Sequence, residues 1–312
     1  MWSILVGIDF SKGSRSALAQ AVRLGRVHGV HIRVIHVIDR GVVEELRDAL
    51  SATDEDARGG IVREAQRRWE EFRVVVETGQ SLKLEVELDH PAATIVRLVR
   101  DADSPLLLLG VHGTSAHGRG PGPVATTCVR NAPASVLLVR ESQTGPFRSV
   151  VACTDFSDIA RKAVSQAAGI AARDLAALHV LHVFRAPWHR LHYRAPTPHV
   201  TPEFQEQFRH ALLGRLKEWT NTALGGQKEL HVEHHLEDCE SHGVGIVDFC
   251  RERGADLVAL GTRGHTHLHD LLLGSTAERV VRDLAGSTLV VKPEGSEHPL
   301  TLQIKPAAPA NT

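Results

Sequence analysis

The sequence predicts an α/β protein made of two similar tandem halves, each a parallel β-sheet with helices on both faces. Segments of the chain recur in the same order after roughly 145 residues, which indicates duplication of one domain. Apolar runs without alternation, such as ILVGI and VVACT, are typical of strands buried on both faces. Helical patterns alternate with these strands, and such alternation favours a parallel sheet.

The first elements of each half are a strand and a helix. SILVGIDFSKGSRSALAQAVRLG from Ser3 matches SVVACTDFSDIARKAVSQAAGIA from Ser149, and we expect Ser14 and Asp158 to open the two helices. The segments VHIRVIHVID and AALHVLHVFR then predict the second strands. Longer helical segments follow at residues 44–72 and 203–222.

The later elements also match in pairs. KLEVEL and HVEHHL predict third strands, and LLLLG and LVALG predict fourth strands. VLLV and TLVV predict fifth strands, whose apolar edges need covering. We therefore expect a first domain at 1–140, a linker at 141–147, a second domain at 148–293 and a loose tail at 294–312.

Composition excludes several classes of protein. A net charge of −1 does not mark a nucleic-acid binder, and 4% aromatic residues argue against a base-stacking surface. The chain has no run of eighteen apolar residues and no start resembling a signal peptide, so we expect a cytosolic protein without a membrane span. No cysteine pair has CxxC spacing, so we expect Cys128, Cys153, Cys239 and Cys250 to be reduced, and most of them to be small core residues.

A glycine-containing loop, GTRGHTHLHDLLLGS, follows the fourth strand of the second half. Ligands of open parallel sheets bind at the carboxyl ends of strands, where this loop lies. Gly261 and Gly264 allow the backbone to approach a ligand, and Gly274 and Ser275 begin a helix whose free N–H groups favour an anion. The alternative is a simple turn, with Ser275 as the helix cap.

The loop has the pattern G-x2-G-x9-G-S, which resembles the nucleotide-binding motif of the universal stress protein family. TDFS, LHV, ADLVALG and STLVVK also resemble that family, in order, over nearly all of both halves. The resemblance implies two Rossmann-like domains, related to the adenine nucleotide alpha hydrolase-like fold, with five-stranded parallel sheets of order 3-2-1-4-5. It also implies an ATP-binding regulatory protein of the stress response.

Matching this sequence to the family motif position by position implies a set of ATP-binding residues. The glycines and Ser275 would hold phosphates and ribose, Asp155 would lie beside the nucleoside, and the backbone of Val183 would meet adenine. Asp155 is also the candidate ligand for an accompanying Mg²⁺, although it could simply cap the following helix. The full expected ATP site is Thr154, Asp155, Val183, Gly261, Thr262, Arg263, Gly264, Gly274, Ser275 and Thr276.

The first half departs from this motif. Eight residues separate Gly113 from Gly122, and Pro123 stands where the second half has Ser275. Proline offers a phosphate neither an N–H nor a hydroxyl, yet it fits a helix start. We therefore expect one nucleotide site per chain and a degenerate first-half site at Asp9, Val37, Gly110, Gly113 and Gly122.

Histidine is abundant, with 20 residues. The H-x-H-x-H series His265, His267 and His269 could hold a transition metal, but contact with phosphate or simple exposure is the preferred interpretation. The pairs His234–His235 and His189–His192 have no third partner of clear spacing, so we expect no metal there.

No P-loop, G-x-S-x-G elbow or kinase signature is present, which favours a binding protein over an enzyme. Slow ATP hydrolysis stays open, because positioning and Mg²⁺ supply some rate. Two alternatives remain: a nucleotide-free scaffold and an ATP-using enzyme of similar fold. The expected partners are adenine nucleotide, the other half of the same chain through the fifth strands, and an unidentified protein. Dimerisation of whole chains is left open.

Overall fold

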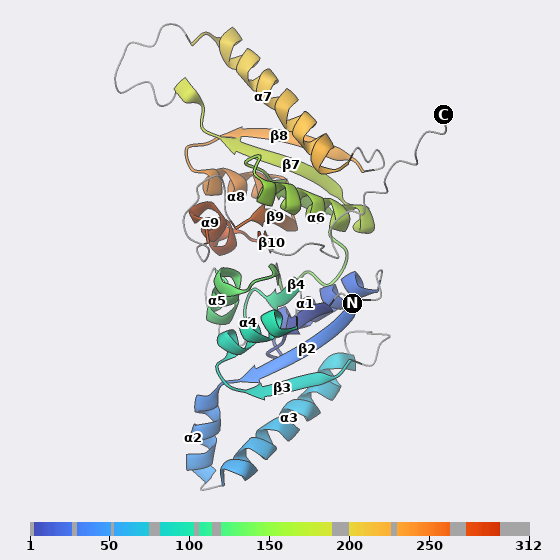
Figure 1. The fold of residues 1–312 in the computed structure, drawn as a ribbon, viewed down its shortest axis with the longest axis vertical. Coiled ribbons are helices and arrows are strands. Elements are labelled where there is room, and N and C mark those ends of the chain that lie inside the picture. Colours follow the sequence, from blue (N-terminus) through green and yellow to red (C-terminus); the bar gives the residue numbers. More distant parts are fainter. Residues whose placement is uncertain are drawn as a thin grey trace.

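The computed structural model describes residues 3–26, 30–50, 53–74, 82–102, 106–113, 120–188, 200–225, 230–262 and 273–293. Its strands form one sheet in the order β3-β2-β1-β4-β5-β10-β9-β6-β7-β8 (Figure 1). The strands are β1 (Ser3–Gly7), β2 (His31–Ile38), β3 (Leu84–Leu88), β4 (Leu106–Gly110), β5 (Ser135–Val139), β6 (Ser149–Cys153), β7 (Ala177–Phe184), β8 (Val232–Asp238), β9 (Leu257–Gly261) and β10 (Ser287–Val291). The helices are α1 (Lys12–Gly25), α2 (Arg40–Leu50), α3 (Asp54–Val74), α4 (Pro91–Asp101), α5 (Pro123–Asn131), α6 (Asp158–Asp174), α7 (Pro202–Ala223), α8 (His242–Glu252) and α9 (Ser275–Asp283).

The strand order within each half is 3-2-1-4-5, and neighbouring strands within a half are parallel. The α/β prediction is therefore confirmed. The two five-stranded sheets are joined, however, because β5 and β10 pair antiparallel with Leu137 opposite Leu289. The apolar fifth strands thus cover each other, and the free edges of the whole sheet are β3 and β8.

The helices cover the two faces of the sheet differently. Helices α1, α3, α6 and α7 pack on one face over a single hydrophobic core that continues across the junction, with Leu137 and Leu289 in it. On the other face, α4 and α5 cover the first half and α8 and α9 the second, over two clusters. The first of these also includes Val281 of α9 and Val290 of β10, so it too crosses the junction. Packing therefore crosses the junction on both faces, and on the face of α1 and α6 one core runs through both halves.

Helix starts differ from the sequence-based expectation by a few residues. Ser11 and Ser157 are the N-caps of α1 and α6, each accepting a hydrogen bond from the backbone N–H three residues on. Ser14 is therefore inside its helix, and Asp158 is the first helical residue. The predicted helix at 44–72 is two helices, α2 and α3, and the Thr53 hydroxyl accepts from the Asp56 N–H at the start of the second.

Aromatic side chains anchor the long helices. Trp69 and Phe72 of α3 are buried, and Phe208 and Trp219 of α7 pack against the same core. Their helical spacing therefore reflects packing against the sheet. Phe204 is the exception, because it is about half exposed.

The segment between the halves is tied to the first helix. The buried Gln20 side chain donates to the carbonyls of Gln143 (3.1 Å) and Gly145 (2.7 Å). Phe147 is fully buried, and its N–H donates to Asp174 Oδ2 at 2.8 Å. Asp174 also pairs with Arg23, so a nearly buried carboxylate of α6 binds a guanidinium of α1. The division at 141–147 stays a prediction.

This buried pair gives a stability test. We expect Asp174→Ala to lower the free energy of unfolding by about 3–5 kcal/mol, because Arg23 and the Phe147 N–H lose a partner inside the protein. The exposed Lys12–Glu141 pair, 3.5 Å apart, is the control, and Glu141→Ala should cost less than about 1 kcal/mol. Urea unfolding followed by tryptophan fluorescence measures both, and equal effects would contradict the assigned role of Asp174.

Candidate functional site

A pocket of about 420 Å³ opens at the carboxyl ends of β6, β7 and β9, beside the start of α9. All the described residues of the expected ATP site line it. Arg263 and Gly264 lie outside the described residues. The lining consists of Cys153, Thr154, Asp155, Ala160, Leu181, His182, Val183, His242, Ile246, Leu260, Gly261, Thr262, Gly274, Ser275, Thr276 and Ala277.

The two ends of the glycine loop are closed by one backbone hydrogen bond. The Gly274 N–H donates to the Thr262 carbonyl at 2.8 Å, which sets the start of α9 beside the end of β9. A Cβ on Gly274 would lie 3.1 Å from that carbonyl oxygen, so the approach is close. Gly274 is the N-cap and Ser275 the first helical residue, so the idea that Ser275 caps this helix is wrong.

The threonines of the pocket differ in their hydrogen bonds. The Thr154 hydroxyl accepts from the Phe156 N–H at 2.9 Å and so belongs to the turn after β6. Thr262 is 3% exposed, and its hydroxyl has no partner among the described residues. Leaving a buried hydroxyl unpaired costs about 1–3 kcal/mol, so this group favours a ligand in the pocket.

Asp155 lies at the end of β6, where the chain turns into α6. Its Oδ1 accepts from the Ser157 N–H at 3.0 Å, and Ser157 itself is the N-cap. Asp155 therefore shapes the turn without being the cap. Between them, Phe156 has φ 68°, a left-handed conformation that is strained for a non-glycine residue. Phe10 has φ 63° at the matching place of the first half, so both halves use this turn.

Two histidines of the pocket were not among the predicted site residues. His182 Nδ1 donates to the Thr154 carbonyl at 2.8 Å, and its ring packs on Phe156 with centroids 4.5 Å apart. Burial lowers the pKa of His182, so the ring is neutral near pH 7. His182 lies in the LHV segment that resembles the family, so this motif could have identified it as a site residue. No motif in the sequence pointed to His242, the first residue of α8.

The first half keeps a pocket of about 480 Å³ at the matching position. Asp9, Val37, Gly110, Gly113 and Gly122 all line it. The loop is closed in the same way, because the Gly122 N–H donates to the Val111 carbonyl at 2.9 Å. The first half therefore keeps a cavity at the matching position although its glycine motif differs from that of the second half.

The two linings differ in polar groups. Val111 replaces Thr262, Pro123 replaces Ser275, and Pro91 replaces His242. Asp39 adds a second carboxylate beside that of Asp9. At these three matching positions the first-half pocket lacks the hydroxyl, the N–H and the imidazole of the second half, although Ser14 and His112 also line it. The extra carboxylate of Asp39 would repel a phosphate.

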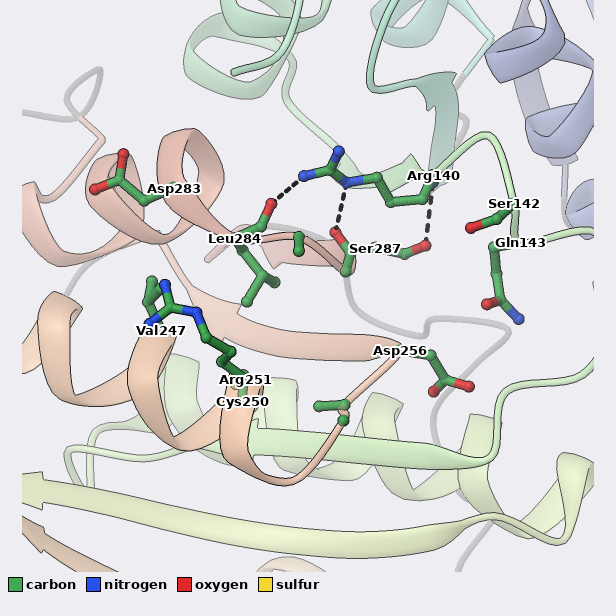
Figure 2. Close-up of a pocket in the computed structure, with 14 residues that line it drawn as sticks. Arg140, Ser142, Gln143, Val247, Cys250, Arg251, Asp256, Asp283, Leu284 and Ser287 are labelled. Atoms are coloured by element: carbon green, nitrogen blue, oxygen red, sulfur yellow. Dashed lines mark hydrogen bonds between the residues drawn. The ribbon is translucent and has the colours of Figure 1, made fainter. Parts of the chain in front are cut away.

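A third pocket, of about 300 Å³, lies at the junction of the halves (Figure 2). Arg140 spans it, and its guanidinium donates to the carbonyls of Leu284 and Gly286. The Arg140 N–H donates to the Ser287 hydroxyl at 3.2 Å. Since these bonds join the end of β5 to the turn before β10, we interpret this pocket as part of the junction.

The structure also brings a cluster of histidines together at the sheet edge. His235 has the partners His179 and Glu233, whose ligand atoms lie close enough for a metal ion, so the expectation that His235 lacks a third partner is wrong. The series His265, His267 and His269 and the pair His189–His192 lie outside the described residues. The cluster arises because β7 and β8, far apart in sequence, are neighbours in the sheet.

The remaining sequence expectations concern cysteines and membrane spans. All four cysteines are free, and Cys128, Cys153 and Cys250 are buried. Burial raises the pKa of Cys128 and of Cys250 to about 12, so both thiols stay protonated near pH 7. Within the described ranges, each helix is too short or too polar to cross a bilayer.

Two equivalent histidines make stability depend on pH. His36 Nδ1 donates to the Ile8 carbonyl at 2.8 Å, as His182 does to that of Thr154, and burial lowers the pKa of both. The folded protein therefore binds fewer protons than the unfolded chain, whose histidines titrate near pH 6.5. We expect stability to be full above about pH 7 and to fall with acidification, by up to about 1.4 kcal/mol per pH unit for each histidine.

The measurement is the free energy of unfolding between pH 5 and 8. The double variant His36→Gln/His182→Gln keeps an N–H donor and should flatten the acid side of the profile. The exposed His31 gives the control, His31→Gln. An unchanged slope in the double variant would contradict this account.

The chain was compared with known proteins. The model of the Universal stress protein family matches residues 1–140 and 146–292. A universal stress protein of Mycolicibacterium smegmatis is 27% identical over 307 residues, which cover 94% of this chain and 97% of the relative. Universal stress protein E of Photorhabdus laumondii is 25% identical over 96% of this chain and 97% of its own length.

A crystal structure of a universal stress protein from Archaeoglobus fulgidus shares the fold. Its TM-score is 0.61 at 17% identity, with 94% of this chain and 98% of that chain covered. The match of the family model to both halves, the full-length relatives and the repeated 3-2-1-4-5 sheets agree. The chain therefore belongs to the universal stress protein family, as a member with two tandem domains.

Proposed function

We propose that this chain is a regulatory protein of the stress response that binds ATP in the pocket of its second half. The observation that carries the proposal is the buried hydroxyl of Thr262, which has no partner among the described residues and lines that pocket next to the start of α9. A polar group without a protein partner inside a cavity is satisfied when a polar ligand enters. The membership of the chain in the universal stress protein family supports the same conclusion.

The phosphates would lie at the start of α9. The N–H groups of Ser275 and Thr276 lie in the first turn, where helical N–H groups have no partner within the helix and the helix dipole is positive. The hydroxyls of Thr262, Ser275 and Thr276 add donors around the same place. Arg263 and Gly264, by resemblance to the family motif, complete this part of the site.

The nucleoside would lie at the ends of β6 and β7. Leu181, Val183 and Ile246 form an apolar wall on which an adenine ring can pack, and Val183 can offer its backbone to the base. Asp155 can accept hydrogen bonds from ribose hydroxyls, and it is the carboxylate we assign to an accompanying Mg²⁺.

The first half would hold no ATP. Its pocket has the size for a ligand, but Pro123 removes the first N–H of α5 and Val111 removes the hydroxyl. Asp39 adds a second carboxylate to the one that both halves have, and this extra negative charge opposes a polyphosphate. We therefore propose one nucleotide per chain.

ATP would act as a signal in the cytosol, where it is abundant, by favouring one conformation of the chain or one protein partner. Such regulation requires that ATP bind one state more tightly than the other. In this lining the His182 Nδ1 is bonded to the Thr154 carbonyl and not to a serine, so we propose a binding protein.

Exchange of the two helix starts tests the site. We expect Ser275→Pro to weaken ATP binding by about 10- to 100-fold, because hydrogen bonds to charged groups contribute about 1.5–3 kcal/mol each. Proline is accepted at the first position of a helix, as Pro123 shows, so the fold should persist. Calorimetric titration of nucleotide-free protein with ATP and Mg²⁺ measures affinity and stoichiometry.

The matched control is Pro123→Ser, which should leave the second-half affinity unchanged. Two ATP molecules per wild-type chain would contradict the assignment of a single site. Undiminished binding in Ser275→Pro would place the phosphates elsewhere. A wild-type chain that binds no ATP would favour a nucleotide-free scaffold.

Product analysis separates a binding protein from an enzyme. We expect ATP incubated with the protein and Mg²⁺ to yield only slow release of ADP, because positioning and Mg²⁺ by themselves supply a modest rate. Rapid formation of AMP or of an adenylylated product would contradict the proposal and favour an ATP-using enzyme.

A further inference from the structure

A compact group of possible metal ligands lies at the outer edge of the second half. His179 belongs to β7, and Glu233 and His235 belong to the edge strand β8. In the register of the two strands, His179 lies opposite Glu233, and His235 lies two residues further on. Side chains two residues apart on a strand point to the same face, so the three are brought together by the sheet itself.

The distances among the three ligand atoms match those of a tetrahedral metal site. His179 Nδ1 lies 3.2 Å from His235 Nε2, and Glu233 Oε2 lies 3.5 Å from the former and 3.4 Å from the latter. Ligand atoms placed about 2.0–2.1 Å from a tetrahedral Zn²⁺ are roughly 3.3–3.4 Å apart. Three corners of such a tetrahedron are therefore already formed.

The surroundings hold the two imidazoles in place. The side chains of His179 and His235 are 8% and 13% exposed, and the His235 ring packs on Phe249 of α8 with centroids 4.8 Å apart. Burial lowers the pKa of both histidines, which favours the neutral form that binds metals. Glu233 is 39% exposed, so the fourth corner is open to water.

The matching positions of the first half hold an ion pair and no histidines. Arg33 matches His179, and Glu85 matches His235, because both pairs occupy the same positions in the parallel register. Arg33 and Glu85 form a two-pronged ion pair with distances of 2.9 and 2.7 Å. The second half has exchanged this pair for two imidazoles next to a carboxylate.

We propose that His179, Glu233 and His235 bind one Zn²⁺, with water as the fourth ligand. The ion would join the edge strand β8 to β7 at the end of α8 that carries Phe249. The nucleotide pocket lies nearer the other end of that helix, at His242 and Ile246. Two nitrogens and one carboxylate oxygen form a ligand set that zinc takes in proteins.

The test is titration of the metal-free full chain with Zn²⁺ against a chromophoric chelator. Because the loop histidines could bind zinc themselves, the background carries His265→Ala, His267→Ala and His269→Ala. We expect one Zn²⁺ per chain in this background. Co²⁺ in place of Zn²⁺ should give the intense visible absorption of a tetrahedral site.

The decisive variant in the same background is His179→Arg/His235→Glu, which installs the ion pair of the first half and so should keep the fold. It should weaken Zn²⁺ binding by more than the roughly 10- to 100-fold typical of losing an outer-shell partner. The single variant His179→Ala should do the same. The matched control is His234→Ala on the opposite face of β8, which should leave zinc affinity unchanged.

Circular dichroism and the urea midpoint check that each variant is folded. Absence of Zn²⁺ binding in the loop background, with or without binding in the wild-type chain, would overturn the proposal. Unchanged binding in His179→Arg/His235→Glu would also overturn it. Loss of binding in that variant and in His179→Ala, with binding retained in His234→Ala, would establish the site.

Discussion

The antiparallel pairing of β5 with β10 is the constraint on which the rest of the molecule depends. Each half alone would end in a largely apolar edge strand, and an exposed edge of that kind invites association. Pairing the two edges buries Leu137 against Leu289 and makes one hydrophobic core continuous from α1 to α6. Arg140, Gln20 and the Arg23–Asp174 pair then fix the connecting segment, so the two pockets keep a set relation within one sheet.

The two halves share the residues that stabilise the fold and differ in residues that line the pockets. The strained turn after the first strand, the buried histidine bonded to a carbonyl, and the hydrogen bond closing the glycine loop occur in both halves. The differences fall on the pocket linings. Thr262 and Ser275 of the second half correspond to Val111 and Pro123 of the first half. These differences leave the hydrogen bonds that close the two loops intact, so the lining of a pocket can change while the half keeps its structure.

Helix α8 connects the two sites assigned to the second half. Its first turn, with His242, borders the pocket proposed for ATP, and its third turn, with Phe249, packs on His235 of the histidine cluster. The first-half counterpart α4 begins with Pro91, and the strands beneath it carry the Arg33–Glu85 pair. The second half has therefore gained polar chemistry at both ends of one helix, while the first half has apolar or ion-paired residues there.

The sequence by itself determined the duplication, the order of strands and helices, and the position of the pocket residues. Repeats and uninterrupted apolar runs depend only on local order along the chain, and the carboxyl ends of parallel strands must meet at one edge. Only the tertiary structure decided how the halves join, which residue caps each helix, and that the first half keeps its cavity. It also decided the cluster of His179, Glu233 and His235, because strand register brings residues more than fifty positions apart into contact and no local pattern encodes register.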